Sequence, residues 1–361
     1  MQDKALVAMS GGVDSSVALL KTIEMGLKPI GVTMKLWDYS TVGGNVTVND
    51  NNCCALESIN DAKIVCDQLQ VPHYTLDFTD VFRKKVVDNF ASEYLKARTP
   101  NPCVRCNSYV KWDAFIEQAD KLGAKYIVTG HYAQIDKDKG ENFIIKKGID
   151  PIKDQSYVLW GIPKETISRT ILPLGGLTKK EVRKIASTNN LETANTPESM
   201  EICFVADNNY KRFLKDYSKK EINKIGKGRI VNDSNEQIGE HDGYPNYTVG
   251  QRKGVGLAHS KPRYVKSIDK DTNTVMISEK KNMFSSNCNV SQENWLIDTA
   301  KIPMQIEAQI RYNSKPVKCK ILDKKKLVVN FDEPQFAVTP GQSIVFYNDD
   351  ILLGGGIIET K

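Results

Sequence analysis

The most restrictive feature of this sequence is a short apolar run that leads directly into a glycine-containing turn and then a helix. Ala5–Met9 is apolar throughout, as expected for a strand buried in a parallel sheet. Ser10-Gly11-Gly12-Val13-Asp14-Ser15-Ser16 follows, and a helical pattern runs from Ser15 to about Met25. Glycines let the backbone turn tightly towards an anion, and N–H groups at a helix start attract negative charge. The segment therefore predicts a phosphate-binding loop.

Two better-known phosphate loops do not match this segment. No Gly-Lys-Ser/Thr follows the glycines, so it is not a Walker A loop, and the spacing differs from the dinucleotide pattern G-x-G-x-x-G. Five fixed residues of this kind recur by chance about once in several thousand chains of this size. An ordinary glycine turn before a helix is the structural alternative.

The rest of the first third alternates strands with helices. Strands are predicted at 29–36, 73–77 and 126–129, and helices at 55–69, 81–95 and 111–122. This order predicts an α/β fold with a doubly wound parallel sheet.

Beyond Gln155 the pattern changes twice. Thr178–Glu181 reads as a capping box that opens a helix to about Thr188, and 208–217 is also predicted helical. After Gly226 short strands and turns follow one another closely, which predicts a small barrel or sandwich at the C-terminus. We therefore expect three domains: a catalytic domain at 1–208, a small mixed middle domain at 209–280 and a barrel at 281–361.

Composition excludes several classes of protein. The chain has 361 residues, 40% hydrophobic and 26% charged, as in ordinary globular proteins, and no apolar run reaches the roughly 18 residues of a membrane span. The N-terminus has no basic segment or cleavage site typical of a secretory signal. Eight cysteines without an export signal favour a reducing compartment. We expect a cytoplasmic protein with no membrane partner.

The basic residues gather in the rear of the chain. Net charge is +6, and residues 211–270 carry 14 Lys/Arg against 7 Asp/Glu. Such a distribution favours a polyanionic partner, although a solvated lysine-rich surface would look the same.

Three cysteines lie in unusual surroundings. Cys103 and Cys106 belong to Thr99–Asn107, in which two prolines predict an exposed loop rather than a helix interior. Cys203 follows a second predicted loop at 195–198. The remaining cysteines lack such context, and we expect them to be inert: Cys53, Cys54, Cys66, Cys288 and Cys319.

The phosphate-loop segment resembles the PP-loop of the ATP pyrophosphatases, and the chain as a whole resembles the tRNA-specific 2-thiouridylases. The second resemblance covers essentially the whole chain and rests on many ordered segments. They include Gly31–Lys35, the T-P-N-P…C-N segment, Thr129–Tyr132, Lys153–Tyr157, Ile202-Cys203-Phe204, Tyr247–Gly254 and Ala337–Gln342. These enzymes place sulfur at position 2 of the wobble uridine of tRNA.

The resemblance implies ATP and Mg²⁺ as cofactors. ATP would be cleaved between its α and β phosphates, adenylating the uridine C2 oxygen and releasing pyrophosphate. The residues matching the family's ATP site are Ala8, Met9, Ser10, Gly11, Gly12, Val13, Asp14, Ser15, Met34 and Gly130. Asp14 would help to organise the pyrophosphate and its Mg²⁺.

The resemblance also assigns roles to two cysteines. Cys203 would carry the sulfur as a persulfide supplied by a cysteine desulfurase or sulfur-relay protein. Cys106 would complete the transfer by forming a disulfide with Cys203 or by releasing hydrosulfide from it. Many relatives have Asp where this chain has Cys103, and a thiol cannot replace that Asp unchanged. Cys103, Cys106 and Cys203 are therefore also candidate ligands of a 4Fe–4S cluster, although Cys-x-x-Cys is equally a zinc or redox spacing.

The implied partner is the anticodon stem-loop of tRNA. Asn101, Pro102 and Cys103 match the residues that meet the target base, and the segments matching tRNA contacts are Lys153-Asp154-Gln155 and Arg311-Tyr312. The target uridine must leave its stack to react.

Two other functions remain open on the sequence. A PP-loop synthetase that adenylates a small carboxylate or nucleobase would not need paired reactive cysteines or a basic rear half. A non-catalytic RNA-binding protein would not need an intact Ser-Gly-Gly-Val-Asp-Ser.

Overall fold

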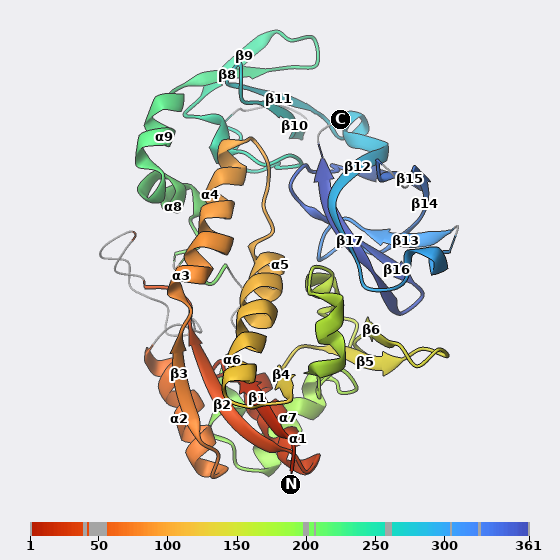
Figure 1. Cartoon of the computed structure of the whole chain (residues 1–361). Helices are drawn as coiled ribbons and strands as arrows, with labels where there is room; N and C mark the ends of the chain where they lie inside the picture. The colour runs from red at the N-terminus through yellow and green to blue at the C-terminus, as the bar shows by residue number, and fades with distance from the viewer. Residues whose placement is uncertain are drawn as a thin grey trace.

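In the computed structural model, an N-terminal α/β domain, a small middle domain and a C-terminal barrel follow one another along the chain (Figure 1). The structure describes residues 2–38, 42, 56–197, 202–205, 207–256, 262–303, 305–323 and 326–359. Cys53 and Cys54 lie outside the described residues. No described helix has the length and apolar character needed to cross a membrane.

The N-terminal domain is built on a five-stranded parallel sheet in the order β3-β2-β1-β4-β7. Its strands are β1 (Lys4–Ala8), β2 (Lys28–Lys35), β3 (His73–Asp77), β4 (Tyr126–Val128) and β7 (Thr170–Ile171). The chain moves outwards from β1 to β2 and β3, and β4 returns to the other side of β1. The sheet therefore has its topological switch point between β1 and β4, where open α/β sheets bind ligands. The expected doubly wound fold is confirmed.

Helices cover both faces of this sheet. They are α1 (Val13–Glu24), α2 (Leu56–Gln68), α3 (Thr79–Phe82), α4 (Asp88–Leu95), α5 (Pro102–Cys106), α6 (Phe115–Lys121) and α7 (Lys179–Thr188). Two of the helices are longer than these labels suggest, because π-helical turns at Arg83–Val87 and Asn107–Ala114 join α3 to α4 and α5 to α6. Thr178 and Glu181 form the predicted capping box at the start of α7.

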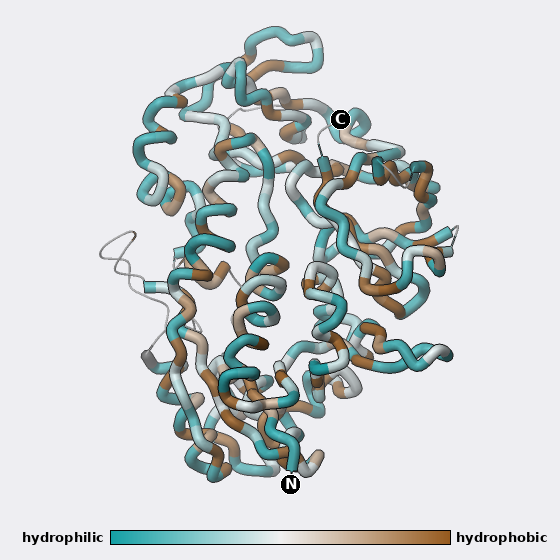
Figure 2. The backbone as a smooth tube through the Cα atoms, viewed as in Figure 1, coloured by the Kyte–Doolittle hydropathy of each residue, from teal (hydrophilic) through white to brown (hydrophobic). Residues whose placement is uncertain are grey.

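Successive residues of the central strands bury their side chains on opposite faces of the sheet. Leu6, Val32 and Met34 join one hydrophobic cluster, whereas Ala5 and Val7 join the other together with residues of α1 and α7. Figure 2 shows hydrophobic colour concentrated on the central strands and on the barrel, and mostly hydrophilic colour on the hairpin of β8 (Gly228–Val231) and β9 (Gln237–His241). Both faces of the sheet are thus buried, as a parallel sheet requires.

The middle domain carries α8 (Tyr210–Tyr217), α9 (Lys219–Ile225) and a four-stranded sheet in the order β10-β11-β8-β9. Its strands are β8 (Gly228–Val231), β9 (Gln237–His241), β10 (Arg263–Asp269) and β11 (Thr274–Glu279).

The C-terminal strands close into a barrel. They are β12 (Phe284–Trp295), β13 (Ile306–Gln309), β14 (Val317–Asp323), β15 (Val328–Phe336), β16 (Ser343–Asn348) and β17 (Ile351–Glu359). Pairing of β12 with β17 completes the ring, so the predicted barrel is confirmed.

A hairpin that the sequence did not predict ties the first domain to the barrel. Strands β5 (Ala133–Lys137) and β6 (Phe143–Lys147) follow β4, and β6 pairs with the barrel strand β17 at Ile351 and Leu352. Backbone hydrogen bonds therefore cross the expected boundary between the first and last domains.

Candidate functional site

The predicted phosphate loop lies at the switch point of the sheet. Ala8 ends β1, the Met9 N–H bonds the Val32 carbonyl at 2.8 Å, and Gly12 occupies the cap position of α1. Ser15 Oγ accepts from the Ser10 N–H at 3.2 Å and donates to the Gly12 carbonyl at 2.9 Å. The cap residue, Gly12, has no side chain that could bond the first N–H groups of α1. The helix start therefore keeps donors for an anion.

Gly130 approaches this loop from the end of β4. A Cβ at Gly130 would lie 2.9 Å from the Asp14 carbonyl carbon and 3.1 Å from the Ser15 nitrogen. Only glycine lets the end of β4 come this close to the first turn of α1. Met34, near the end of β2, is buried at 8% exposure on the neighbouring strand. The structure thus brings together the residues that the sequence assigned to ATP.

Asp14 has two partners that sequence reasoning missed. Lys179 Nζ lies 2.7 and 2.8 Å from the two Asp14 carboxylate oxygens, and the Tyr132 hydroxyl donates to one of them at 2.7 Å. The Lys179 side chain is only 12% exposed. The capping box marked the start of α7, but nothing in the sequence indicated that this helix start faces α1. A positive side chain beside a phosphate loop can neutralise anionic oxygens.

The segment around Cys106 differs from its expected form. Pro102, Cys103 and Cys106 form the first turns of α5 rather than a loop, because Asn101 caps the helix through the Val104 N–H. Pro102 occupies the first helical position, where a missing N–H costs nothing. Cys103 is exposed, whereas Cys106 is buried in the main core cluster. The prediction that prolines exclude a helix here was wrong.

The position of Cys203 is fixed by the packing of the next residue, Phe204. Cys203 itself is half-buried, while Phe204 is 2% exposed and packs edge-on against Phe90 and Phe213 with ring centres 5.2 Å apart in each case. Phe213 comes from α8 of the middle domain. Cys203 packs against the same hydrophobic cluster that contains Cys106. The structure thus brings both candidate cysteines to one core.

The donor set for an iron–sulfur cluster does not fit. In the described part of the chain, no three His, Cys, Asp or Glu side chains form a group that could hold a metal ion. Cys103 is exposed, whereas Cys106 is buried. The cluster suggested by the three cysteines is therefore not supported.

The other cysteines in the described residues are buried. Burial raises the pKa of Cys66 and of Cys319 to about 12, and Cys288 is 2% exposed. Buried thiols of this kind stay protonated and unreactive, in agreement with the sequence.

Residues expected to meet tRNA converge near Asn101. The Tyr312 hydroxyl donates to the Asp154 carbonyl at 3.1 Å, and its ring packs edge-on against Tyr157 at 5.9 Å. Burial raises the pKa of Tyr312, and Asp154 and Cys103 act in the same direction. Burial raises the pKa of Tyr157, and hydrogen bonding with Asn101 and with the Ser343 carbonyl, to which the Tyr157 hydroxyl donates at 2.9 Å, partly offsets that effect. Three separate stretches of the chain therefore meet here.

Some of these side chains are already engaged within the chain. The Asp154 carboxylate accepts from the Gly148 and Ser156 N–H groups, and Gln155 Oε1 accepts from the Tyr132 N–H at 3.0 Å. Arg311 donates to the Ala337 carbonyl, and burial lowers its pKa. Lys153 lies in the same turn, where its N–H bonds the Asp150 carbonyl at 3.1 Å. Tyr132 thus joins Gln155 to Asp14 and links the tRNA segment to the phosphate loop.

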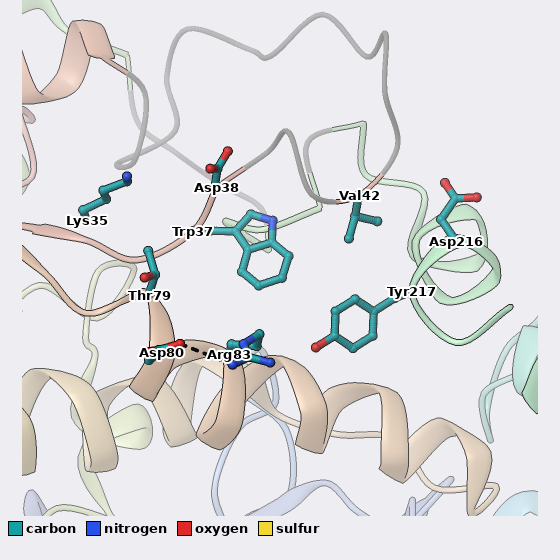
Figure 3. A pocket seen from close by; sticks show the side chains of 9 residues that line it. All are labelled: Lys35, Trp37, Asp38, Val42, Thr79, Asp80, Arg83, Asp216 and Tyr217. Carbon is teal, nitrogen blue, oxygen red and sulfur yellow. Dashed lines mark hydrogen bonds and ion pairs between the residues drawn. The ribbon is translucent and has the colours of Figure 1, made fainter. Parts of the chain in front are cut away.

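A cavity of about 460 Å³ lies beyond the ends of β2 and β3 (Figure 3). Trp37 and Tyr217 lie on two sides of it, and the Asp80–Arg83 ion pair, 3.2 Å long, forms part of its wall. Of its lining residues, the sequence analysis singled out only Lys35, as the last residue of the segment Gly31–Lys35. Trp37 also touches Phe204, with ring centres 6.3 Å apart, so the cavity borders the cluster that holds Cys203.

Comparisons with known proteins agree over the whole length. Three family models match, described as "tRNA methyl transferase HUP domain" at 3–207, "tRNA methyl transferase PRC-barrel domain" at 211–279 and "Aminomethyltransferase beta-barrel domain" at 285–358. The chain is 46% identical to the tRNA-specific 2-thiouridylase MnmA of Carboxydothermus hydrogenoformans, over 99% of this chain and 98% of that protein. It is 40% identical to the protein of that name from Clostridioides difficile, over 100% and 99%.

The likeness of the chain to one solved structure is weak. A complex of a 4-thiouridine synthetase with RNA and ATP matches at a TM-score of 0.37 and 18% identity, over 56% of this chain and 45% of that chain. A likeness of this size carries no argument about the site.

Proposed function

This chain belongs to the family of tRNA-specific 2-thiouridylases and is a tRNA-uridine 2-sulfurtransferase, and we propose that it works by adenylation followed by sulfur transfer from a cysteine persulfide. The observation that carries the mechanism is the pairing of a phosphate loop at the sheet switch point with two cysteines in one core. The phosphate loop alone, or the two cysteines alone, would also be compatible with a protein that does not transfer sulfur.

In the first step the uridine C2 oxygen attacks the α phosphorus of ATP and pyrophosphate leaves. The N–H groups at the start of α1 and the hydroxyls of Ser10 and Ser15 would hold the phosphates. Bound Mg²⁺ would neutralise the departing pyrophosphate, and the Asp14 carboxylate would help to hold it. Lys179 would then pass from Asp14 to a phosphate oxygen, because it is the cation already at that carboxylate.

In the second step a persulfide on Cys203 delivers its outer sulfur to C2, and AMP leaves. If the persulfide attacks directly, the Cys106 thiolate then attacks the inner sulfur of Cys203 and releases the 2-thiouridine. If Cys106 attacks first, hydrosulfide is released and attacks C2. Both routes end with a disulfide between Cys106 and Cys203, which external thiols of a reducing cytoplasm would return to two thiols.

The surface for the anticodon stem-loop would lie around Asn101, Pro102 and Cys103. Lys153–Gln155 and Arg311–Tyr312 reach the same place from two other parts of the chain. The basic stretch 211–270 would contact tRNA phosphates farther away, since phosphate contacts supply affinity while an unstacked base supplies specificity. A cysteine desulfurase or sulfur-relay protein would supply sulfur to Cys203.

The test combines two assays on one preparation. Purified protein is given ATP, Mg²⁺ and a tRNA with an unmodified wobble uridine, and pyrophosphate release is measured with and without a persulfide donor. We expect tRNA-dependent pyrophosphate release, and 2-thiouridine only when the donor is present. Release stimulated by a small carboxylate or nucleobase, or tRNA binding without release, would overturn the proposed mechanism.

A further inference from the structure

The four residues before the helix that carries Cys106 form several hydrogen bonds with the C-terminal barrel. This segment, Arg98–Asn101, leaves α4 and enters α5 beside the barrel (Figure 1). The Thr99 N–H donates to the Pro340 carbonyl at 2.9 Å. Gln342 Nε2 donates to the carbonyls of Thr99 and Pro100, at 3.0 Å in both cases. The backbone of the segment is thus paired with a barrel loop.

An ion pair closes the same contact. The Arg98 guanidinium donates to both carboxylate oxygens of Glu359, near the end of β17, and to Glu93 at 2.6 Å. Arg98 is only 14% exposed and Glu359 28%. Ser291 of β12 donates to Glu359 as well. A two-pronged arginine–carboxylate contact fixes orientation as well as distance.

The barrel loop Pro340–Gln342 lies so close to Thr99 that there is no room for a side chain between the two backbones. Gly341 has a φ of +90°, and a Cβ there would lie 2.8 Å from both the nitrogen and the oxygen of Thr99. The loop is also tied to β17, because the Gly341 N–H donates to the Ile358 carbonyl at 2.8 Å. Movement of β17 would therefore be transmitted to Thr99.

We propose that Arg98, Glu359 and the loop Pro340–Gln342, together called the barrel clamp, position the target-base residues and Cys106 for reaction. The clamp acts on the segment through which the chain reaches Asn101, the cap of α5, and Cys106 stands on that helix. The same barrel carries Arg311 and Tyr312. The barrel is then a part of the reactive centre as well as a surface for tRNA.

This inference rests on the proposed function, and its test uses the conservative change Glu359→Gln. That variant removes one charge while Arg98 keeps Glu93, so no buried charge is left alone. The matched control is Asp350→Asn, which removes the 3.0 Å pair between Lys146 of the hairpin and the opposite end of β17. Both changes remove one ion pair between the first domain and the barrel.

We expect Glu359→Gln to lower the kcat of thiolation by about 10²-fold, the size of effect a misplacement of about 1 Å can produce. The KM for tRNA should stay within about twofold, because none of the clamp's hydrogen bonds described above involves the other expected tRNA contacts, Lys153–Gln155 and Arg311–Tyr312. Asp350→Asn should leave both constants unchanged. Equal effects of the two variants, or an unchanged kcat in Glu359→Gln, would overturn the proposal.

A second measurement does not depend on activity. Hydrogen exchange at 98–106 should become faster in Glu359→Gln but not in Asp350→Asn, because the Thr99 N–H is bonded to the clamp. Unchanged exchange in Glu359→Gln would also overturn the proposal. A wild-type enzyme that makes no 2-thiouridine would refute the proposed function instead, and the exchange result would still decide on the clamp.

Discussion

The phosphate loop and the segment Arg98–Cys106 reach their places by different means. The loop is contiguous with β1 and α1, and its internal hydrogen bonds join residues no more than five positions apart. The segment is held by residues more than 240 positions away, in the barrel. Local sequence therefore shapes the first region, whereas the second depends on the whole chain having folded. Mutations should separate the two regions by which half of the reaction they impair.

The sharpest separation is expected from Cys203→Ser. Serine cannot carry a persulfide, so 2-thiouridine should fall below detection while tRNA-dependent pyrophosphate release continues. Mass spectrometry of the tRNA and a pyrophosphate assay measure the two steps. Retained thiolation would remove Cys203 as the sulfur carrier. Thiolation retained by Cys103→Ser would count further against an iron–sulfur cluster, since the described residues contain no metal-binding group.

Asp14→Asn should impair the other region. It keeps the shape of the side chain but loses the charge that pairs with Lys179 and would hold Mg²⁺. We expect pyrophosphate release to fall by about 10²–10³-fold, as when a charge-stabilising group is removed from an active site. Thermal unfolding serves as the control for folding. Full activity in a folded variant would contradict the assignment of the loop to ATP.

A pair of glycine variants compares the two close approaches directly. Gly130→Ala would push a Cβ against the backbone of Asp14, and Gly341→Ala would push one against Thr99. Overpacking of about 1–3 kcal/mol is expected in each case, or roughly tenfold in a kinetic constant. Gly130→Ala should raise the KM for ATP, whereas Gly341→Ala should lower the kcat of thiolation and leave the KM for ATP unchanged. The same phenotype in both variants would mean that the regions are not independent.

Lowering the pH should reduce the stability of the two regions at different pH values, and the expected effect is small. Burial lowers the pKa of His131, next to Gly130, well below 6.5, so the unfolded chain binds more protons and stability falls as pH drops below about 6.5. Burial alone would raise the pKa of Glu359, but Arg98 and Ser291 lower it below 4.5, so its contribution is lost only in more acidic solution. Tm against pH should be flatter above pH 5 in His131→Gln than in wild type. Glu359→Gln should alter the curve only below about pH 4.5. An unchanged curve in His131→Gln would contradict the first expectation.

Much of the fold could be read from local patterns. The strands near β1, β2, β3 and β4 and the capping box of α7 were predicted because burial on both faces and helix capping leave local signatures. The short strand β7 and the hairpin β5–β6 were not predicted. A two-residue strand leaves no local signature, and neither does the choice of a distant pairing partner. Pro102 misled the prediction for α5 because proline is a breaker inside a helix but is favoured at its first position.

The sequence by itself determined the phosphate loop, the residue types for thiol chemistry and the order of the three domains, because each of these is carried by neighbouring residues. Only the tertiary structure decided that Lys179 pairs with Asp14 and that Glu359 pairs with Arg98. It also decided that Cys106 is buried while Cys103 is exposed. The physical reason is the same in all three cases. Side chains far apart in sequence meet only when the packing of sheet and barrel brings them together, and one pattern along the chain is compatible with many such meetings.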